Sequence, residues 1–243
     1  MQIFLLHFAG GNKYSFDFLK RYLKSNIQLF PLELPGRGQR FGEPFVFDID
    51  SAAADYADQI KSLRNNDKYL IYGHSMGATI GLFTAKIMED LLDPPEFLIV
   101  SGNAGPGAKE IDAQGKEVIQ PKRYLMNDED FKKELRELGG IPEAILESEE
   151  MYDFFSPIIR ADFEVLEKED LSLREIEIKI PIHAMMGDSE KKAGQIENWK
   201  NFTSELFSHR IFEGNHFFIH SYPSELMQTI IDYTKADDLI KAY

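Results

Sequence analysis

The chain has 243 residues, 43% of them hydrophobic, which suits a single α/β domain with a sizeable core. Its 27 basic residues stand against 41 acidic ones, so the net charge is −14, and no Lys/Arg-rich block interrupts this balance. Such a charge argues against nucleic acid or an anionic membrane as partner. Because the chain has no cysteine, a disulfide framework, a thiolate metal site and a cysteine nucleophile are excluded.

Neither a targeting segment nor a membrane span is expected. The apolar run at residues 1–6 is too short for a signal peptide, and no basic residue precedes it. No apolar stretch approaches the ~20 residues that cross a bilayer. We therefore expect a soluble, cytoplasmic protein.

Short, continuous apolar runs alternate along the chain with segments of helical spacing. The runs suit strands that are buried on both faces, as in a parallel sheet. Strands are expected at residues 3–8, 27–34, 69–72, 97–100, 182–186 and 210–212. Helices are expected at residues 14–23, 51–63, 75–92, 196–206 and 223–233. This alternation predicts an α/β fold with a mostly parallel, doubly wound sheet in one domain over residues 1–243.

The alternation stops between residues 104 and 170, where no convincing strand is found. Asn127 and the acidic residues after it form a capped helix start, and two glycines end that helix after Leu138. A second helix is expected from Glu149 to beyond Arg160. Helices inserted between two strands of such a sheet can cover an active site, so we expect residues 104–170 to form a helical lid.

The segment Gly73-His74-Ser75-Met76-Gly77 carries the main chemical pattern. It is G-x-S-x-G between an expected strand and an expected helix, which is the context of a nucleophile elbow. A chance glycine-rich turn is the alternative, and the flanking strand and helix disfavour it. The pattern predicts the α/β-hydrolase fold, with Ser75 as nucleophile.

A serine hydroxyl needs a base within hydrogen-bond reach. His216 follows the last expected strand on a loop near the chain end, and the chain order Ser, acid, His of α/β-hydrolases favours it as the base. His74 adjoins the serine, but its backbone direction should point it elsewhere. His183 lies inside a buried strand. His209 precedes a strand, and His220 lies in a helical or turn segment.

Two carboxylates, Asp188 and Glu190, lie in the turn after the strand at 182–186. Either could orient His216 and stabilise its imidazolium. An oxyanion hole needs two backbone N–H groups, which we expect from Met76 and from Ala9 in the glycine-rich turn at residues 8–11. The glycines at 10–11 lack the Walker spacing, and those at 36–38 lack the third glycine of a dinucleotide fingerprint.

Together these segments resemble the stand-alone type II thioesterases associated with nonribosomal peptide and polyketide synthetases. The resemblance covers nearly the whole chain, and its lid motifs are more diagnostic than the elbow, which generic esterases share. The matching segments are Phe8-Ala9-Gly10-Gly11, Leu34-Pro35-Gly36-Arg37-Gly38, the elbow, Leu138-Gly139-Gly140-Ile141-Pro142, residues 154–166 with Pro157, Arg160, Asp162 and Leu166, and Gly214-Asn215-His216-Phe217-Phe218.

The chain departs from the family pattern at three positions. His7 stands where the family usually has proline, and Ala78 where a second glycine is common. The family's acid, usually an aspartate three residues after the glycine, falls here on Glu190. We therefore favour Glu190 over Asp188 as the acid, and expect Asp188 to cap or solvate the turn.

The resemblance implies a substrate that is an acyl group held as a thioester on the phosphopantetheine arm of a carrier protein. Such an enzyme would clear stalled or misprimed acyl units through an acyl-enzyme, without a metal or cofactor of its own, and we expect a monomer. Basic residues before the lid helices, Lys122 and Arg123 above all, are predicted to dock the carrier.

Two other interpretations stay open. A small-molecule carboxylesterase or an acyl-CoA thioesterase could use the same fold, and neither would depend on a carrier. A non-catalytic binding module is the alternative from another class, although Ser75, His216 and an acid are all present.

Overall fold

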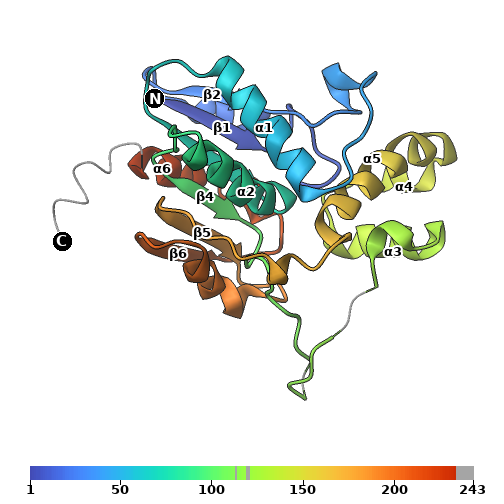
Figure 1. The fold of residues 1–243 in the computed structure, drawn as a ribbon. Coiled ribbons are helices and arrows are strands. Elements are labelled where there is room, and N and C mark those ends of the chain that lie inside the picture. Colours follow the sequence, from blue (N-terminus) through green and yellow to red (C-terminus); the bar gives the residue numbers. More distant parts are fainter. Residues whose placement is uncertain (113, 119–120, 234–243) are drawn as a thin grey trace.

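Six parallel strands form one sheet at the centre of the molecule (Figure 1). The computed structural model describes residues 1–112, 114–118 and 121–233. In the order in which they lie side by side, the strands are β2 (Gln28–Pro31), β1 (Gln2–Leu6), β3 (Tyr69–His74), β4 (Leu98–Ser101), β5 (Ile182–Gly187) and β6 (Phe207–Phe212). Because every neighbouring pair is parallel, the carboxyl ends of all six strands lie along one edge.

Burial explains which segments form strands. β1, β3, β4 and β5 are buried over their whole length, as their continuous apolar runs predict. β6 begins three residues before the predicted strand, and its middle residues are exposed at the edge of the sheet. The prediction relied on continuous apolar residues, so it missed the first half of β6, which is mostly polar. His209 therefore lies inside β6, and the expectation that it precedes a strand was wrong.

Helices cover both faces of the sheet. On one face pack α1 (Ile49–Leu63), α2 (Met76–Asp90) and the 3-10 helix η5 (Ala193–Phe202). On the other face pack η1 (Asp17–Tyr22) and α6 (Pro223–Tyr233). This layering agrees with the predicted doubly wound α/β fold.

Two segments predicted as α-helices, residues 14–23 and 196–206, form the 3-10 helices η1 and η5 instead. The buried side chains of η5, Ile196, Trp199 and Phe202, repeat every three residues. Phe16 and Leu19 are buried with the same spacing at η1. A repeat of three matches the 3-10 helix, which has three residues per turn, so this spacing explains the difference.

The segment between β4 and β5 is largely helical, as predicted. It holds η3 (Arg123–Leu125), α3 (Asp128–Leu138), α4 (Glu143–Glu147), α5 (Glu149–Glu167) and η4 (Leu171–Leu173). Its described residues pair only in one isolated antiparallel bridge, between Ile111 and Glu117. Asn127 caps α3 by accepting the N–H of Asp130 (2.9 Å), whereas the short α4 was not predicted.

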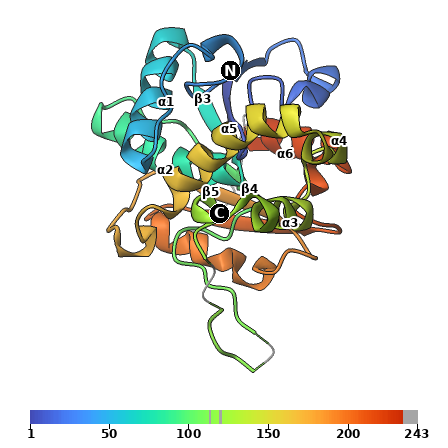
Figure 2. The ribbon, with the colours of Figure 1, turned by 90° about the vertical axis from the view of Figure 1, so that its right-hand side faces the viewer.

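The helices of this segment share an apolar cluster of their own, built around Phe131, Tyr152 and Phe163. Figure 1 shows α3, α4 and α5 beside the end of the sheet toward which the strands point, and Figure 2 looks onto α5 from that side. In the described part of the chain, no helix is long and apolar enough to cross a membrane.

Candidate active site

Three polar side chains meet at the carboxyl edge of the sheet. Ser75 directly follows β3, Glu190 lies in the loop after β5, and His216 lies in the loop after β6. In open α/β sheets this edge is where ligands bind, because the loops from several strands converge there. The sheet thus brings together residues that are up to 141 positions apart.

Ser75 adopts a strained backbone conformation, with φ of 56° and ψ of −112°. Its N–H donates to the carbonyl of Ser101 at the end of β4 (2.7 Å), which holds the turn in place. A Cβ on Gly73 would lie 2.1 Å from the carbonyl oxygen of Gly77, and one on Gly77 would lie 2.1 Å from that of Leu6. Both glycines of the elbow are therefore required by close backbone approach.

A line of hydrogen bonds connects the three side chains. The Ser75 hydroxyl lies 2.9 Å from Nε2 of His216, and Nδ1 of His216 lies 2.8 Å from Oε2 of Glu190. A carboxylate beside Nδ1 places the ring proton there and leaves Nε2 as an acceptor for the hydroxyl proton. The side chain of Glu190 is 8% exposed, and its other oxygen accepts the N–H of Gly187 (2.8 Å). This arrangement can activate a serine for acyl transfer.

Asp188, the alternative acid, faces another part of the site. Its Oδ1 accepts the N–H of Gly214 (2.9 Å) and the Ser189 hydroxyl (3.0 Å). The hydrogen bond from Gly214 lowers the pKa of this exposed carboxyl. Asp188 thus ties the loop after β5 to the loop that carries His216, while Glu190 contacts the ring itself.

The sequence model of the thioesterase domain family matches residues 1–238. The chain belongs to this family. Gramicidin S biosynthesis protein GrsT of Aneurinibacillus migulanus is 29% identical over 94% of this chain and 86% of its own. Thioesterase PikA5 of Streptomyces venezuelae is 27% identical over 94% of this chain and 79% of its own.

Among solved structures, the type II thioesterase BorB from the borrelidin biosynthetic cluster matches with a TM-score of 0.80 and 26% identity, over 96% of this chain and 91% of its own. These matches confirm the predicted resemblance to type II thioesterases. They also confirm the α/β-hydrolase fold and the assignment to the enzymes that act on thioesters.

Aromatic rings surround His216 in the thioesterase. Phe217 packs edge-on against His216 (ring centroids 5.1 Å apart) and against Phe8 (5.0 Å). His74 lies 5.0 Å from the His216 ring, and its Nδ1 is 2.8 Å from the Ser101 hydroxyl. Complete burial holds the pKa of His74 well below its usual value, so this ring stays neutral beside His216.

The other histidines lie away from the nucleophile. Nδ1 of His183 lies 2.8 Å from the hydroxyls of Ser208 and Tyr233, whereas its Nε2 is buried without a partner among the described residues. His183 is thus a buried residue within the sheet. His220 lies in the 3-10 helix η6 (Phe218–His220), where its ring stacks on Phe217. Both agree with the reasons for preferring His216.

The two N–H groups expected to face an oxyanion come from different loops. Met76 is the first residue of α2, where no carbonyl of the same helix can accept its N–H. Ala9 follows β1, and among the described residues no acceptor is found for its N–H. Ala9 also packs against the apolar cluster of the helical segment.

Several residues that support the site were not assigned a role from the sequence. The Asn103 amide donates to the Ser75 carbonyl (3.2 Å) and to the Thr79 hydroxyl (3.0 Å), and so holds the elbow from the β4 side. Arg37 and Asp162 form a buried ion pair between a loop of the sheet and α5. Arg37 and Asp162 lie in two of the segments that carry the family resemblance. That resemblance is the only feature of the sequence that singled them out.

The predicted docking residues differ in their surroundings. Lys122 is exposed, and its ammonium group donates to the carbonyl of Lys168 (2.8 Å). Arg123 is half-buried, since its Nε and backbone N–H both donate to Glu167 (2.6 Å each) and its guanidinium lies 4.3 Å from the centre of the Phe163 ring. Arg123 therefore joins η3 to α5, and Lys122 is the more accessible of the two.

The described residues contain no cluster of three or more His, Cys, Asp or Glu side chains that could hold a metal ion.

Proposed function

We propose that this thioesterase hydrolyses acyl groups from the phosphopantetheine arm of carrier proteins, with Ser75 as nucleophile, His216 as base and Glu190 as acid. The continuous line of hydrogen bonds from Ser75 through His216 to Glu190 is the main support. The type II thioesterase BorB and the gramicidin S protein GrsT, both from biosynthetic pathways, support the carrier-bound substrate. An intact line of this kind disfavours a non-catalytic binding module.

In the acylation step, the Ser75 oxygen attacks the thioester carbonyl carbon while its proton passes to Nε2 of His216. Glu190 holds the ring in orientation and stabilises the imidazolium. The N–H groups of Ala9 and Met76 hold the negative oxygen of the tetrahedral intermediate. The carbon–sulfur bond then breaks, and His216 returns its proton to the leaving sulfur. A thiol, with a pKa of ~8.5 for its class, leaves readily.

In the deacylation step, His216 takes a proton from water, and the resulting hydroxide attacks the ester carbonyl of the acyl-enzyme. The Ser75 oxygen leaves with that proton, and the free acid is released. All proton transfers use side chains of this chain, so the proposed reaction requires no metal or cofactor.

We further propose that the helical segment from 104 to 170 is a lid that shapes access to Ser75, and that a monomer suffices for the reaction. The direct packing of Ala9 against the apolar cluster of this segment supports a lid. For docking of the carrier, exposed Lys122 is the better candidate, because Arg123 is occupied by Glu167.

The proposed function can be tested by comparing three substrates with one enzyme preparation: acetyl-carrier protein, acetyl-coenzyme A and a simple oxygen ester such as p-nitrophenyl acetate. We expect the highest kcat/KM with the carrier-bound thioester, and loss of all three activities in Ser75→Ala. Equal kcat/KM for acetyl-coenzyme A and the carrier would favour the acyl-CoA thioesterase. A preference for the oxygen ester would favour the carboxylesterase.

A further inference from the structure

A buried ion pair joins the helical segment to the loops of the sheet. Arg37 lies between β2 and the 3-10 helix η2 (Gly38–Arg40), and Asp162 lies in α5. The two side chains are 4% and 1% exposed. They form a bidentate pair, in which NH1 and NH2 of Arg37 each donate to one oxygen of Asp162 at 2.6 Å.

The same pair holds the loop that carries Ala9. Oδ2 of Asp162 accepts the backbone N–H of Gly10 (2.7 Å), and NH1 of Arg37 also donates to the carbonyl of Gly11 (3.3 Å). Gly10 has a φ of +74°, and a Cβ there would lie 3.0 Å from the side chain of Ile159 in α5. The loop after β1 is thus fixed to α5 directly by the hydrogen bond to Asp162 and by close packing, and indirectly through Arg37.

We propose that Arg37 and Asp162 are positioning residues, which fix the N–H of Ala9 toward the oxyanion by clamping its loop to α5. The inference rests on the proposed function, in which Ala9 is an oxyanion donor. An N–H donor acts only if it points at the place where charge develops, so an error of about 1 Å in its position can cost 10²-fold in rate. Asp162 holds the residue directly after Ala9, where a small displacement has the largest effect.

The energetics of burial support positioning rather than stability as the role of the pair. Two charges taken out of water lose hydration that their mutual attraction only partly restores, and apolar residues of similar size often replace such pairs without loss of stability. Nε of Arg37 is buried without a partner among the described residues, which adds to this cost. A charged pair gives what apolar packing cannot, namely a directed acceptor for the N–H of Gly10.

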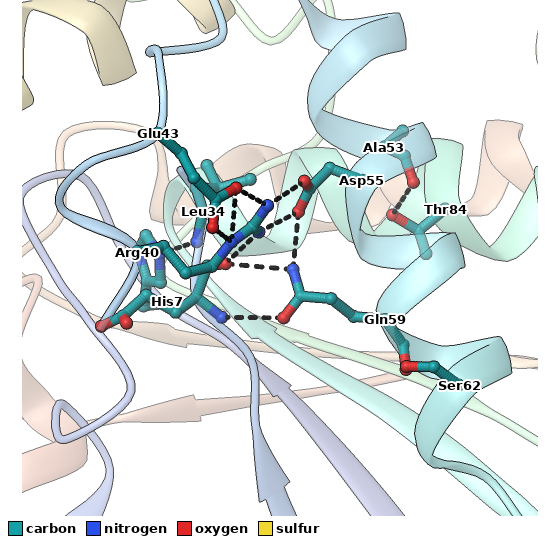
Figure 3. A network of polar contacts seen from close by, with 10 residues as sticks. His7, Leu34, Arg40, Glu43, Ala53, Asp55, Gln59, Ser62 and Thr84 are labelled. Atoms are coloured by element: carbon teal, nitrogen blue, oxygen red, sulfur yellow. Dashed lines mark hydrogen bonds and ion pairs between the residues drawn. The ribbon is translucent and has the colours of Figure 1, made fainter. Parts of the chain in front are cut away.

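A second Arg–Asp pair near the same loop provides a matched control. Arg40 donates to both oxygens of Asp55 in α1, at 2.6 and 2.8 Å, and to the carbonyl of Glu33 (Figure 3). Gln59 and Glu43 complete this network, which is part-buried. It reaches the loop after β1 at His7 and through Glu33, which accepts the backbone N–H of Lys13 (3.2 Å). The Arg40–Asp55 pair resembles the Arg37–Asp162 pair, which we call the clamp, in geometry, but it does not bind Gly10.

The test compares Asp162→Asn, Arg37→Lys and the apolar double variant Arg37→Met/Asp162→Leu with the control Asp55→Asn. The readouts are kcat and KM for acetyl-coenzyme A, the affinity for an alkylboronic acid that forms a tetrahedral adduct on the nucleophile, and the thermal unfolding temperature. We expect kcat to fall about 10²-fold in Asp162→Asn and in the double variant, with KM within about threefold of the wild type. Boronate affinity should fall with kcat, because both depend on the oxyanion donors.

Arg37→Lys keeps one donor toward Asp162 and should retain more activity than Asp162→Asn. Asp55→Asn should stay within about threefold of the wild-type kcat. A folded double variant with wild-type kcat would overturn the proposal, as would an equal loss in Asp55→Asn. If Ser75→Ala retains turnover, the proposed function itself fails. If turnover needs Ser75 but not Asp162, only the clamp fails.

Discussion

The two halves of the site are held by different parts of the molecule. The loops of Glu190 and His216 are tied to each other and to the sheet, since the N–H of Asp188 donates to the carbonyl of Phe212 (2.7 Å) and that of Ser189 to the carbonyl of Gly214 (3.0 Å). The loop of Ala9 is tied instead to α5, through Asp162. In the proposed reaction, the sheet would thus organise proton transfer, whereas stabilisation of the oxyanion would also depend on the helical segment.

The largest effect is expected from the half held by the sheet. Ser75→Ala should lower kcat by roughly 10⁶-fold, because the nucleophile is removed and only binding and the oxyanion donors are left. The hydroxyl contributes little to packing, so circular dichroism should show a folded protein. Turnover by the folded variant at more than a trace of the wild-type rate would remove Ser75 as nucleophile.

Glu190→Gln should lower kcat by roughly 10³- to 10⁴-fold, because an amide cannot fix the proton on Nδ1 of His216 or stabilise the imidazolium. Asp188→Asn is the matched control in the same loop and should cost far less, because Asp188 supports only the Gly214 backbone and Ser189. Steady-state kinetics of the two folded variants decide the assignment. The reverse ranking would transfer the role of the acid to Asp188.

Stability should depend on pH through buried histidines, among them His7 and His183. Burial lowers the pKa of His7, at the start of the Ala9 loop, and of His183, in β5, from 6.5 to about 4 each. Between these pH values the unfolded chain binds protons that the folded protein does not. The contribution of these histidines to the free energy of unfolding is therefore fully present above pH 6.5 and is lost as the pH falls toward 4. Each shift corresponds to ~3 kcal/mol.

Urea unfolding between pH 7 and 4 measures this loss. His7→Gln and His183→Gln should each remove part of the pH dependence, and His74, whose pKa burial also lowers, contributes to what is left. The two effects should be independent, because His7 lies in the loop after β1 and His183 lies in β5. An unchanged pH dependence in either variant would show that its histidine is not buried in the neutral form.

A smaller effect is expected where the helical segment meets His216. A Cβ on Gly140 would lie 2.1 Å from the ring of Phe217, which packs on His216, whereas one on Gly139 would lie 3.9 Å from the same ring. Both glycines have positive φ, so alanine strains the backbone at either position. We expect Gly140→Ala to lower kcat about tenfold more than Gly139→Ala, as measured with acetyl-coenzyme A at a temperature where both are folded. Equal losses would show that Phe217 does not link this turn to the base.

The smallest effect is expected at the docking surface. Lys122→Glu should raise KM for acetyl-carrier protein several-fold and leave KM for acetyl-coenzyme A unchanged, since exposed charges contribute modestly to binding. Lys61→Glu, on α1, serves as the control. Arg123 is a poor position for this test, because a glutamate there would face Glu167. An unchanged KM for the carrier would place its interface elsewhere.

The sequence allowed much of the fold and of the site to be predicted, for physical reasons that also mark the limits. Buried parallel strands are apolar throughout, so β3 and β5 were readily found, and the elbow follows from the glycines that its turn requires. The exposed edge strand β6 lacks a continuous apolar run, and the 3-10 helices do not have the spacing of an α-helix. These elements were therefore predicted incompletely or as the wrong type.

The clamp could not be predicted because it depends on long-range geometry. Arg37 and Asp162 are 125 residues apart, and nothing local distinguishes their side chains from other charged residues of the chain. The same holds for Arg123, whose charge suggested docking but whose contacts to Glu167 and Phe163 are internal. For each of these residues, the role of the charged side chain depends on its partner in the folded structure.

The central claim, that a covalent acyl-enzyme forms on Ser75, is tested most directly by labelling with a fluorophosphonate, which reacts with an activated serine and stays attached. Peptide mass spectrometry of the labelled protein should locate one adduct per chain on Ser75, and hydrolysis of acetyl-carrier protein should fall in proportion to labelling. An adduct on another residue, or full activity in completely labelled protein, would contradict the account.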